Sequence, residues 1–173
     1  FLIFSEKYKT IFSDEVFFPQ NWVVTGYLYR ETINSVRKSA LDTRERLESL
    51  GVSLILGYFD ENVQGKHGKY GLVSRTDHYQ EMRHLAQFLK ANPKVAVIIK
   101  TQFTANTISI YDYDPVIKEA MDSGRLVDLC HGDEKRNNIY PTEVALISDI
   151  CLGNIIGGTA ALEVALCGTR SAL

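Results

Sequence analysis

The chain has 173 residues, 45% of them hydrophobic, and its 19 basic and 21 acidic residues leave a formal net charge of -2. This length and apolar content allow a buried core and predict a single domain over residues 1–173. The near-neutral charge gives no basis for wholesale nucleic-acid binding, and no apolar run approaches the roughly 20 residues needed to cross a bilayer.

Apolar runs alternate with amphipathic stretches along the chain. The apolar runs predict strands over 22–26, 53–59, 95–99, 126–130 and 150–152, and a further run starts at 171. The amphipathic stretches predict helices over 32–50, 77–90, 115–123 and 141–148. A last helix is predicted to open with Gly157-Gly158-Thr159 and to end at Gly168.

Local chemistry indicates where these helices begin and which side of each is buried. Asp77 is expected to start the second helix, and Asp114 before Pro115 is typical of an N-cap and a first helical residue. In 32–50 the expected buried residues are Leu41, Leu47 and Leu50. In 77–90 they are Tyr79, Met82, Leu85, Ala86 and Leu89.

The alternation of strands and helices predicts βαβ units with right-handed crossovers. The expected fold is therefore α/β, a doubly wound Rossmann-like parallel sheet with helices on both faces. Ligands of such sheets bind beyond the carboxyl ends of the strands. The residues that directly follow predicted strands are Gly26, Asp60, Lys100, His131 and Thr159.

The start of the last helix is the main candidate site. Backbone N–H groups at a helix start attract a phosphate, and Gly157 and Gly158 let it approach without meeting a Cβ atom. Thr159 would add a hydroxyl, and Glu163 would accept hydrogen bonds from ribose hydroxyls. The alternative is an ordinary helix capped by Thr159 with Glu163 as a solvated surface acid, although a capping box would place the acid at position 162.

Three further residues could contact the same ligand. Lys100 could pair with a phosphate, or be an ordinary lysine at a strand end. His131 could contact the base or phosphate or carry a proton, although most loop histidines do neither. Tyr140 could stack on a nucleobase, or simply precede a helix that Pro141 initiates.

Other polar motifs are weaker. The glycine- and lysine-rich segment 65–71 could be a flap over a ligand or a solvated loop, and it lacks the ending of a P-loop. Asp112 and Asp114 have the D-x-D spacing of a divalent-metal site, but capping explains Asp114 fully. We therefore predict no metal and no resident cofactor.

The cysteines and the two ends of the sequence indicate the cellular compartment of the protein and whether the chain is part of a longer one. Cys130, Cys151 and Cys167 have no C-x-x-C spacing and are expected to be reduced thiols of a cytoplasmic protein. No signal-peptide pattern opens the chain. Because the sequence lacks an initiator Met and ends in what resembles a strand, we expect it to be a fragment of a longer protein.

From about residue 22 to 173 the chain resembles the C-terminal, donor-binding domain of a GT-B glycosyltransferase of the bacterial surface-polysaccharide type. The resemblance rests on Val24-Thr25-Gly26, Ile55-Leu56-Gly57, Ile98-Ile99-Lys100 and the segment 149–168. It implies a nucleotide-diphosphate sugar donor and a glycan or lipid-linked acceptor, with peripheral membrane association through regions outside this chain. The donor-binding residues it implies are Gly157, Gly158, Thr159, Glu163, Lys100, Tyr140 and Gly26.

The resemblance also bears on the reaction. Retaining GT-B families pair two glutamates eight positions apart, but Ile155 stands eight positions before Glu163. An inverting transferase or a UDP-sugar 2-epimerase is therefore favoured. In such transferases the catalytic base usually lies in the other domain, and His131 is the one candidate within this chain. A non-catalytic Rossmann-like domain that binds a nucleotide or a protein partner is the alternative from another class.

Overall fold

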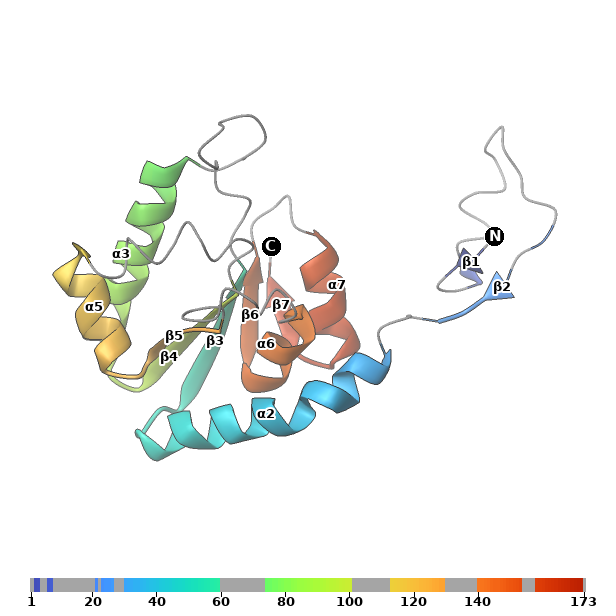
Figure 1. Cartoon of the computed structure of the whole chain (residues 1–173), viewed down its shortest axis with the longest axis horizontal. Coiled ribbons are helices and arrows are strands. Elements are labelled where there is room, and N and C mark those ends of the chain that lie inside the picture. The colour runs from blue at the N-terminus through green and yellow to red at the C-terminus, as the bar shows by residue number, and fades with distance from the viewer. Residues whose placement is uncertain are drawn as a thin grey trace. The chain divides into compact units, whose positions relative to one another are not determined.

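The computed structural model describes residues 2–3, 6–7, 21, 23–26, 30–59, 74–100, 113–129, 140–153 and 158–172 (Figure 1). Internal contacts divide the chain into two compact units, Phe1–Ser35 and Val36–Leu173. In the first unit β1 (Leu2–Ile3) pairs in parallel with β2 (Val23–Val24), with Leu2 opposite Val23. The strand predicted over 22–26 is thus seen as β2, in a two-stranded sheet of its own. The assignment of 1–173 to a single domain stays a prediction.

The second unit contains a five-stranded, all-parallel sheet with the strand order β5-β4-β3-β6-β7. Its strands are β3 (Leu54–Phe59), β4 (Val95–Lys100), β5 (Leu126–Asp128), β6 (Ile150–Gly153) and β7 (Arg170–Ala172). Within this sheet, β3 is the central strand. The chain continues from β3 to β4 and β5 on one side, and then crosses to β6 and β7 on the other side. This confirms the predicted doubly wound, Rossmann-like α/β fold.

The predicted helices are present, with ends that differ by a few residues. They are α2 (Arg30–Ser49), α3 (Arg75–Ala91), α5 (Pro115–Asp122), α6 (Pro141–Ile147) and α7 (Gly158–Leu166). The expected start of α3 at Asp77 was wrong by two residues. Ser74 is the N-cap, and its hydroxyl accepts from the Asp77 backbone N–H at 3.1 Å, so Asp77 completes the first turn.

Helices cover both faces of the sheet, as the alternation of side chains along the strands requires (Figure 1). On one face, residues of α2, α6 and α7 pack with Ile55 and Ile98 in one buried cluster. On the other face, residues of α3 and α5 pack with Val97 and Ile99 in a second cluster. Adjacent residues of β4 thus belong to different cores, which explains why this strand is apolar on both sides.

Glycine at position 57 lets α6 approach the sheet closely. A Cβ atom there would lie 2.6 Å from the Cys151 Sγ, 2.7 Å from a Val144 methyl group and 2.8 Å from the Ser148 hydroxyl oxygen. These distances are shorter than van der Waals contact, so any side chain would force the helix or β6 to move. The glycine therefore sets the separation between α6 and the central strand.

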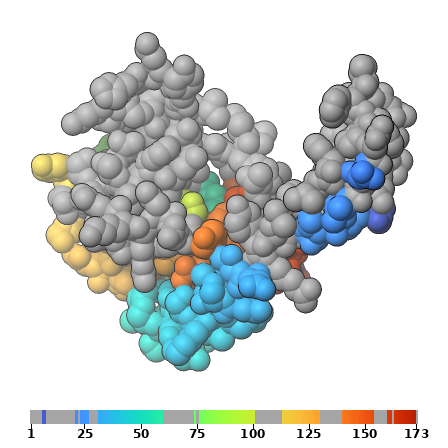
Figure 2. Space-filling model, turned by 45° about the vertical axis from the view of Figure 1, so that its right-hand side comes forward, coloured from blue at the N-terminus to red at the C-terminus, as the bar shows by residue number. Residues whose placement is uncertain are grey.

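The buried side of α2 differs from the prediction. Leu47 is fully buried, as expected, but Leu41 is 47% exposed and Leu50 is 48% exposed. The second buried position is Ala40, which packs in the same cluster as Leu47. Leu41 does not share the buried side of α2 with Ala40 and Leu47, and Leu50 lies beyond the end of the helix. Much of α2 is exposed to solvent, as Figure 2 shows for the segment coloured blue to cyan.

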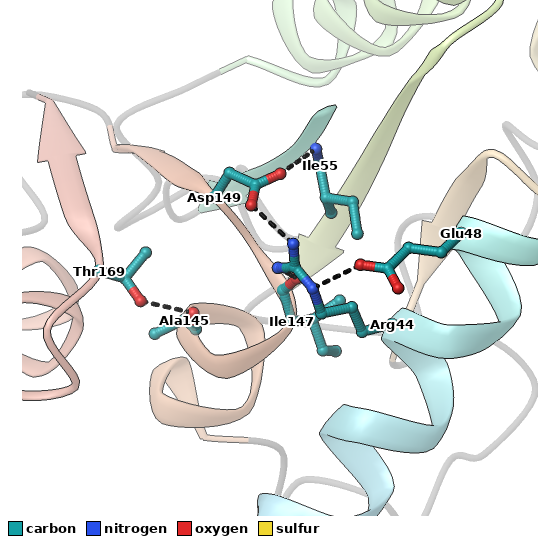
Figure 3. A network of polar contacts seen from close by, with 7 residues as sticks. All are labelled: Arg44, Glu48, Ile55, Ala145, Ile147, Asp149 and Thr169. Atoms are coloured by element: carbon teal, nitrogen blue, oxygen red, sulfur yellow. Dashed lines mark hydrogen bonds and ion pairs between the residues drawn. The ribbon is translucent and has the colours of Figure 1, made fainter. Parts of the chain in front are cut away.

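A polar network ties α2 to the amino ends of β3 and β6 (Figure 3). The Asp149 carboxylate accepts the Ile55 backbone N–H at 2.8 Å and pairs with the Arg44 guanidinium at 2.8 Å. Arg44 also donates to the Ile147 carbonyl at 2.9 Å and pairs with Glu48 at 2.9 Å. The Asp149 hydrogen bond is the largest cause that raises the pKa of Arg44. We call these residues the Arg44–Asp149 network.

Candidate functional site

The connections that follow the neighbouring strands β3 and β6 separate at the carboxyl edge of the sheet. After β3 the chain continues to α3 on one face of the sheet, whereas after β6 it continues to α7 on the other face. The two strands are hydrogen-bonded neighbours, and they end together, with Phe59 opposite Gly153. In open α/β sheets such a separation leaves a crevice beyond the strand ends, where ligands bind. We call the ends of β3 and β6 the switch point.

The main candidate helix follows directly from this switch point. The helix α7 begins at Gly158, five residues after the end of β6. Thr159 is its second residue, and Gly157 lies outside the described residues. Because α7 returns to the amino end of β7, its N-terminus faces the carboxyl edge of the sheet. The helix expected at this position, and its end at Gly168 with a φ of 80°, are confirmed.

Lys100 and Tyr140 also lie at this edge of the sheet. Lys100 is the last residue of β4, half-buried, and stands opposite Phe59 in the register. By alternation from Ile98 it projects to the face that carries α7. Tyr140 is the half-buried N-cap residue of α6, whose side chain makes no capping hydrogen bond.

Three predicted residues are not part of the described edge of the five-stranded sheet. Gly26 follows β2 in the first unit, with a φ of 68° that favours glycine. Its strand is not part of the five-stranded sheet, so its place in a nucleotide site stays a prediction. His131 lies outside the described residues, as does Asp60.

Glu163 lies in the middle of α7 and faces α6. The Thr142 hydroxyl, on a residue that is 1% exposed, donates to the Glu163 Oε2 at 3.2 Å. Burial raises the pKa of the neighbouring Cys167 thiol, while the Thr142 hydroxyl lowers it and the Glu163 carboxylate raises it further. We call Thr142, Glu163 and Cys167 the α6–α7 cluster. Glu163 is half-buried and hydrogen-bonded here, whereas a solvated acid would point to water.

Thr142 was not predicted as a functional residue. Its local sequence, directly after the proline that begins α6, indicates a helix start and nothing about α7. Its contact with Glu163 joins residues that are 21 positions apart. No periodicity within α6 could have found it.

Asp114 is a structural cap. One carboxylate oxygen accepts the backbone N–H groups of Val116 at 2.8 Å and Ile117 at 3.3 Å, and the other accepts the Tyr79 hydroxyl. The Tyr79 hydrogen bond is the largest cause that lowers the pKa of Asp114. The capping interpretation is confirmed, and Asp112 lies outside the described residues. Within the described ranges no three His, Cys, Asp or Glu side chains gather as a metal site would require.

A buried histidine lies in the first turns of α3. His78 is fully buried, and within the part of the chain that the structure describes neither ring nitrogen has a hydrogen-bond partner. Burial lowers the pKa of its imidazole, since a charged ring would lose its hydration. His78 was not among the predicted buried residues, although its spacing of four from Met82 is the signal that marks a shared helix face.

A shallow hollow lies between α3 and α5, and its charged groups are already paired. Lys90 and Glu119 form an ion pair at 2.9 Å across it. Arg125 donates to the Leu89 carbonyl at 2.8 Å and to two further backbone carbonyls, which joins α3 to β4. These contacts make the hollow part of the packing of the fold.

The sequence has no significant match to any protein-family model or to any curated protein. What the chain shows is a parallel, five-stranded α/β sheet of Rossmann-like type. Among the helices of the described residues, none combines the length and the apolar character that a membrane crossing needs.

Proposed function

We propose that this chain is the donor-binding domain of a GT-B glycosyltransferase that uses a nucleotide-diphosphate sugar to build bacterial surface polysaccharide. The observation that carries the proposal is the switch point. The connections that follow β3 and β6 leave toward opposite faces of the sheet, and α7 begins with glycine five residues after β6. A crevice at this place followed by a helix N-terminus is how Rossmann-like folds hold a diphosphate.

The diphosphate would lie against the start of α7. Backbone N–H groups of the first helical turn point out of the helix and favour an anion. Gly157 and Gly158 would let the phosphates approach the backbone, and Thr159 would add a hydroxyl donor. Lys100 lies on the same face of the sheet two strands away, about 10 Å from β6 at ordinary strand spacing, so it could reach the sugar side of the donor.

The nucleoside would extend along α7 toward α6. Glu163 lies five residues after Gly158, about 7 Å further along the helix axis. That separation suits a carboxylate that accepts hydrogen bonds from ribose hydroxyls while the phosphates stay at the helix start. Tyr140, at the start of α6, would offer a ring for the base to stack on.

In the proposed reaction, an acceptor hydroxyl of a glycan or lipid-linked glycan attacks the anomeric carbon, and the nucleoside diphosphate departs with the bonding electron pair. This domain would bind the donor and stabilise the charge of the leaving group. The proton of the acceptor hydroxyl would go to a base in another domain or to His131. Ile155, eight positions before Glu163, favours the inverting class, and we place the reaction in the cytoplasm at the inner face of the membrane.

Isothermal titration of the chain with UDP, CDP, GDP and ADP tests the proposal. We expect one of these diphosphates to bind, and Glu163→Ala to weaken that binding about tenfold or more, because a hydrogen bond to a charged group is worth about 1.5–3 kcal/mol. Glu119→Ala is the matched control, since Glu119 pairs with Lys90 on α3, on the other face of the sheet. This control should bind like the wild type.

Two results would change the conclusion. A folded wild-type chain that binds none of the four diphosphates would overturn the proposal and favour a domain that binds a protein partner. Binding that Glu163→Ala leaves unchanged would remove Glu163 from the site. Product analysis with the full-length protein then separates sugar transfer from 2-epimerisation of a UDP-sugar.

A further inference from the structure

The α6–α7 cluster contains a buried hydroxyl that the proposed nucleotide contacts do not use. The Thr142 side chain is 1% exposed, and its Oγ1 donates to the Glu163 Oε2 at 3.2 Å. Among the described residues Thr142 is the hydrogen-bond partner of this carboxylate. A buried donor that contacts an ionised acceptor limits the rotamers of the acceptor side chain, which would otherwise be numerous for glutamate.

The position of the bond in the fold suits a ligand-binding role. Thr142 is the second residue of α6, so it lies in the helical turn nearest the carboxyl edge of the sheet. It is held by the helix backbone and its buried neighbours Val144 and Ala145, and not by a loop. Because Thr142 donates to Oε2, we assign the ligand contact to the other oxygen of Glu163, Oε1.

We propose that Thr142 is a positioning residue for ribose recognition. Its hydroxyl holds the Glu163 carboxylate in one orientation. The Glu163 side chain then loses little rotational freedom when Oε1 accepts a hydrogen bond from a ribose hydroxyl of a nucleoside diphosphate. Thr142 itself does not touch the nucleotide. This inference rests on the proposed function, and it adds a residue of α6 to a site otherwise built from strand ends and α7.

A second threonine joins α6 to the turn after α7 and serves as the matched control. Thr169 follows α7, and its hydroxyl donates to the Ala145 carbonyl of α6 at 2.7 Å (Figure 3). This bond lies near the other end of α7 and involves no carboxylate. If threonine hydroxyls between α6 and α7 served packing alone, Thr142 and Thr169 would respond alike to substitution.

The experiment compares Thr142→Val, Thr142→Ala, Thr142→Ser and Thr169→Val in the complete chain. Each variant is titrated calorimetrically with whichever of UDP, CDP, GDP and ADP binds the wild type best, and its fold is checked by circular dichroism. We expect Thr142→Val and Thr142→Ala to raise the Kd about tenfold, because an unrestrained Glu163 side chain would lose its rotamer freedom when the nucleotide binds. Thr142→Ser, which restores the hydroxyl, and Thr169→Val should stay within about twofold of the wild type on the same reasoning.

The outcomes separate the inference from the proposed function. If the wild type binds a diphosphate and Thr142→Val binds it equally well, or if Thr169→Val weakens binding as much, the positioning role is wrong and the donor site remains. If the folded wild type binds no diphosphate, the proposed function fails and this inference fails with it. Should both hydroxyl-free variants fail to fold while Thr142→Ser folds, Thr142 serves stability and the inference is overturned.

Discussion

The two ends of the β3–β6 pair are built differently. At the amino ends, the Arg44–Asp149 network joins both strands and α2 through charged side chains that already have partners within the protein. At the carboxyl ends, Phe59 and Gly153 lie opposite each other, and the connections leave toward different faces. Side chains thus hold the two strands together at their amino ends. At their carboxyl ends, the connections to α3 and α7 leave toward opposite faces of the sheet.

Under the proposed function, this difference would let one pair of strands combine stability with binding. A network of ion pairs and hydrogen bonds at the amino ends fixes the distance between β3 and β6 without occupying the ligand edge. In the proposed function, the backbone N–H groups at the start of α7 would bind an anion beyond the carboxyl ends. The predictions below test the first half of this comparison, the stability of the scaffold, from the largest expected effect to the smallest.

Loss of the Asp149 carboxylate should have the largest effect on stability. Asp149→Ala removes the acceptor of the Ile55 N–H and the partner of Arg44, so we expect the free energy of unfolding to fall by about 3 kcal/mol. Urea denaturation measures this change. Asp42→Ala is the control, because Asp42 pairs with Lys38 on the exposed side of α2 and should leave the urea midpoint unchanged. Equal shifts for both variants would contradict a structural role of the network.

A methyl group at position 57 should be the next most damaging change. Gly57→Ala places a Cβ atom within 2.8 Å of atoms in Val144, Ser148 and Cys151, and overpacking of this kind costs about 2 kcal/mol. Urea denaturation of Gly57→Ala alone and with Cys151→Ala tests the cause. The double variant should recover part of the loss, since the Cys151 Sγ is the nearest atom. Strictly additive losses would argue against a local clash.

His78 should make stability depend on pH in the mildly acidic range. Burial lowers the pKa of His78 in the folded state, so the unfolded chain, with a histidine pKa of about 6.5, binds the proton more tightly. The free energy of unfolding is therefore unaffected well above pH of about 6.5 and decreases as the pH falls through that value. Urea titrations at about pH 7.5 and about pH 5.5, on either side of that pKa, measure it.

A histidine on the same helix controls for this effect. His78→Leu should flatten the pH dependence, because the group that takes up the proton on unfolding is gone. His84→Gln should leave it as in the wild type, since His84 is exposed on α3. A steep pH dependence that survives in His78→Leu would show that another group is responsible.

The smallest effect concerns thiol reactivity. Burial raises the pKa of Cys151 to about 11, so its thiol stays protonated at neutral pH. We expect iodoacetamide to label Cys151 in the native protein more slowly than the half-buried Cys167, as peptide mass spectrometry would show. In urea the two rates should converge. Rapid labelling of native Cys151 would mean that the contact between β6 and α6 opens readily.

Much of the fold could be read from residue patterns. The strand β4 is apolar from Val95 to Ile99, as a strand buried on both faces should be, and Asp114 before Pro115 is typical of a helix N-cap, so both elements were predicted correctly. The glycine-initiated helix after the strand at 150 was also correct as an element. Each of these depends on interactions between residues that are close in sequence, for which spacing is sufficient evidence.

The contacts of the candidate site could not be read in this way. The hydrogen bond between Thr142 and Glu163, the pairing of Arg44 with Asp149 and the burial of His78 each depend on which helix packs beside which. Leu41 and Leu50 show the same limit, because α2 buries Ala40 beside the expected Leu47 and leaves these two leucines half-exposed. A helical pattern identifies an apolar side, and neighbouring elements decide how much of it they cover.

The sequence alone determined that this is an α/β chain in which the strand at 150–152 leads to a helix opened by glycine, because strand and helix preferences and turn chemistry are local. The tertiary structure decided the strand order, and with it the switch point between β3 and β6. It also decided that Glu163 meets a buried threonine of α6. These features arise from packing between segments far apart in the chain, which no local pattern encodes.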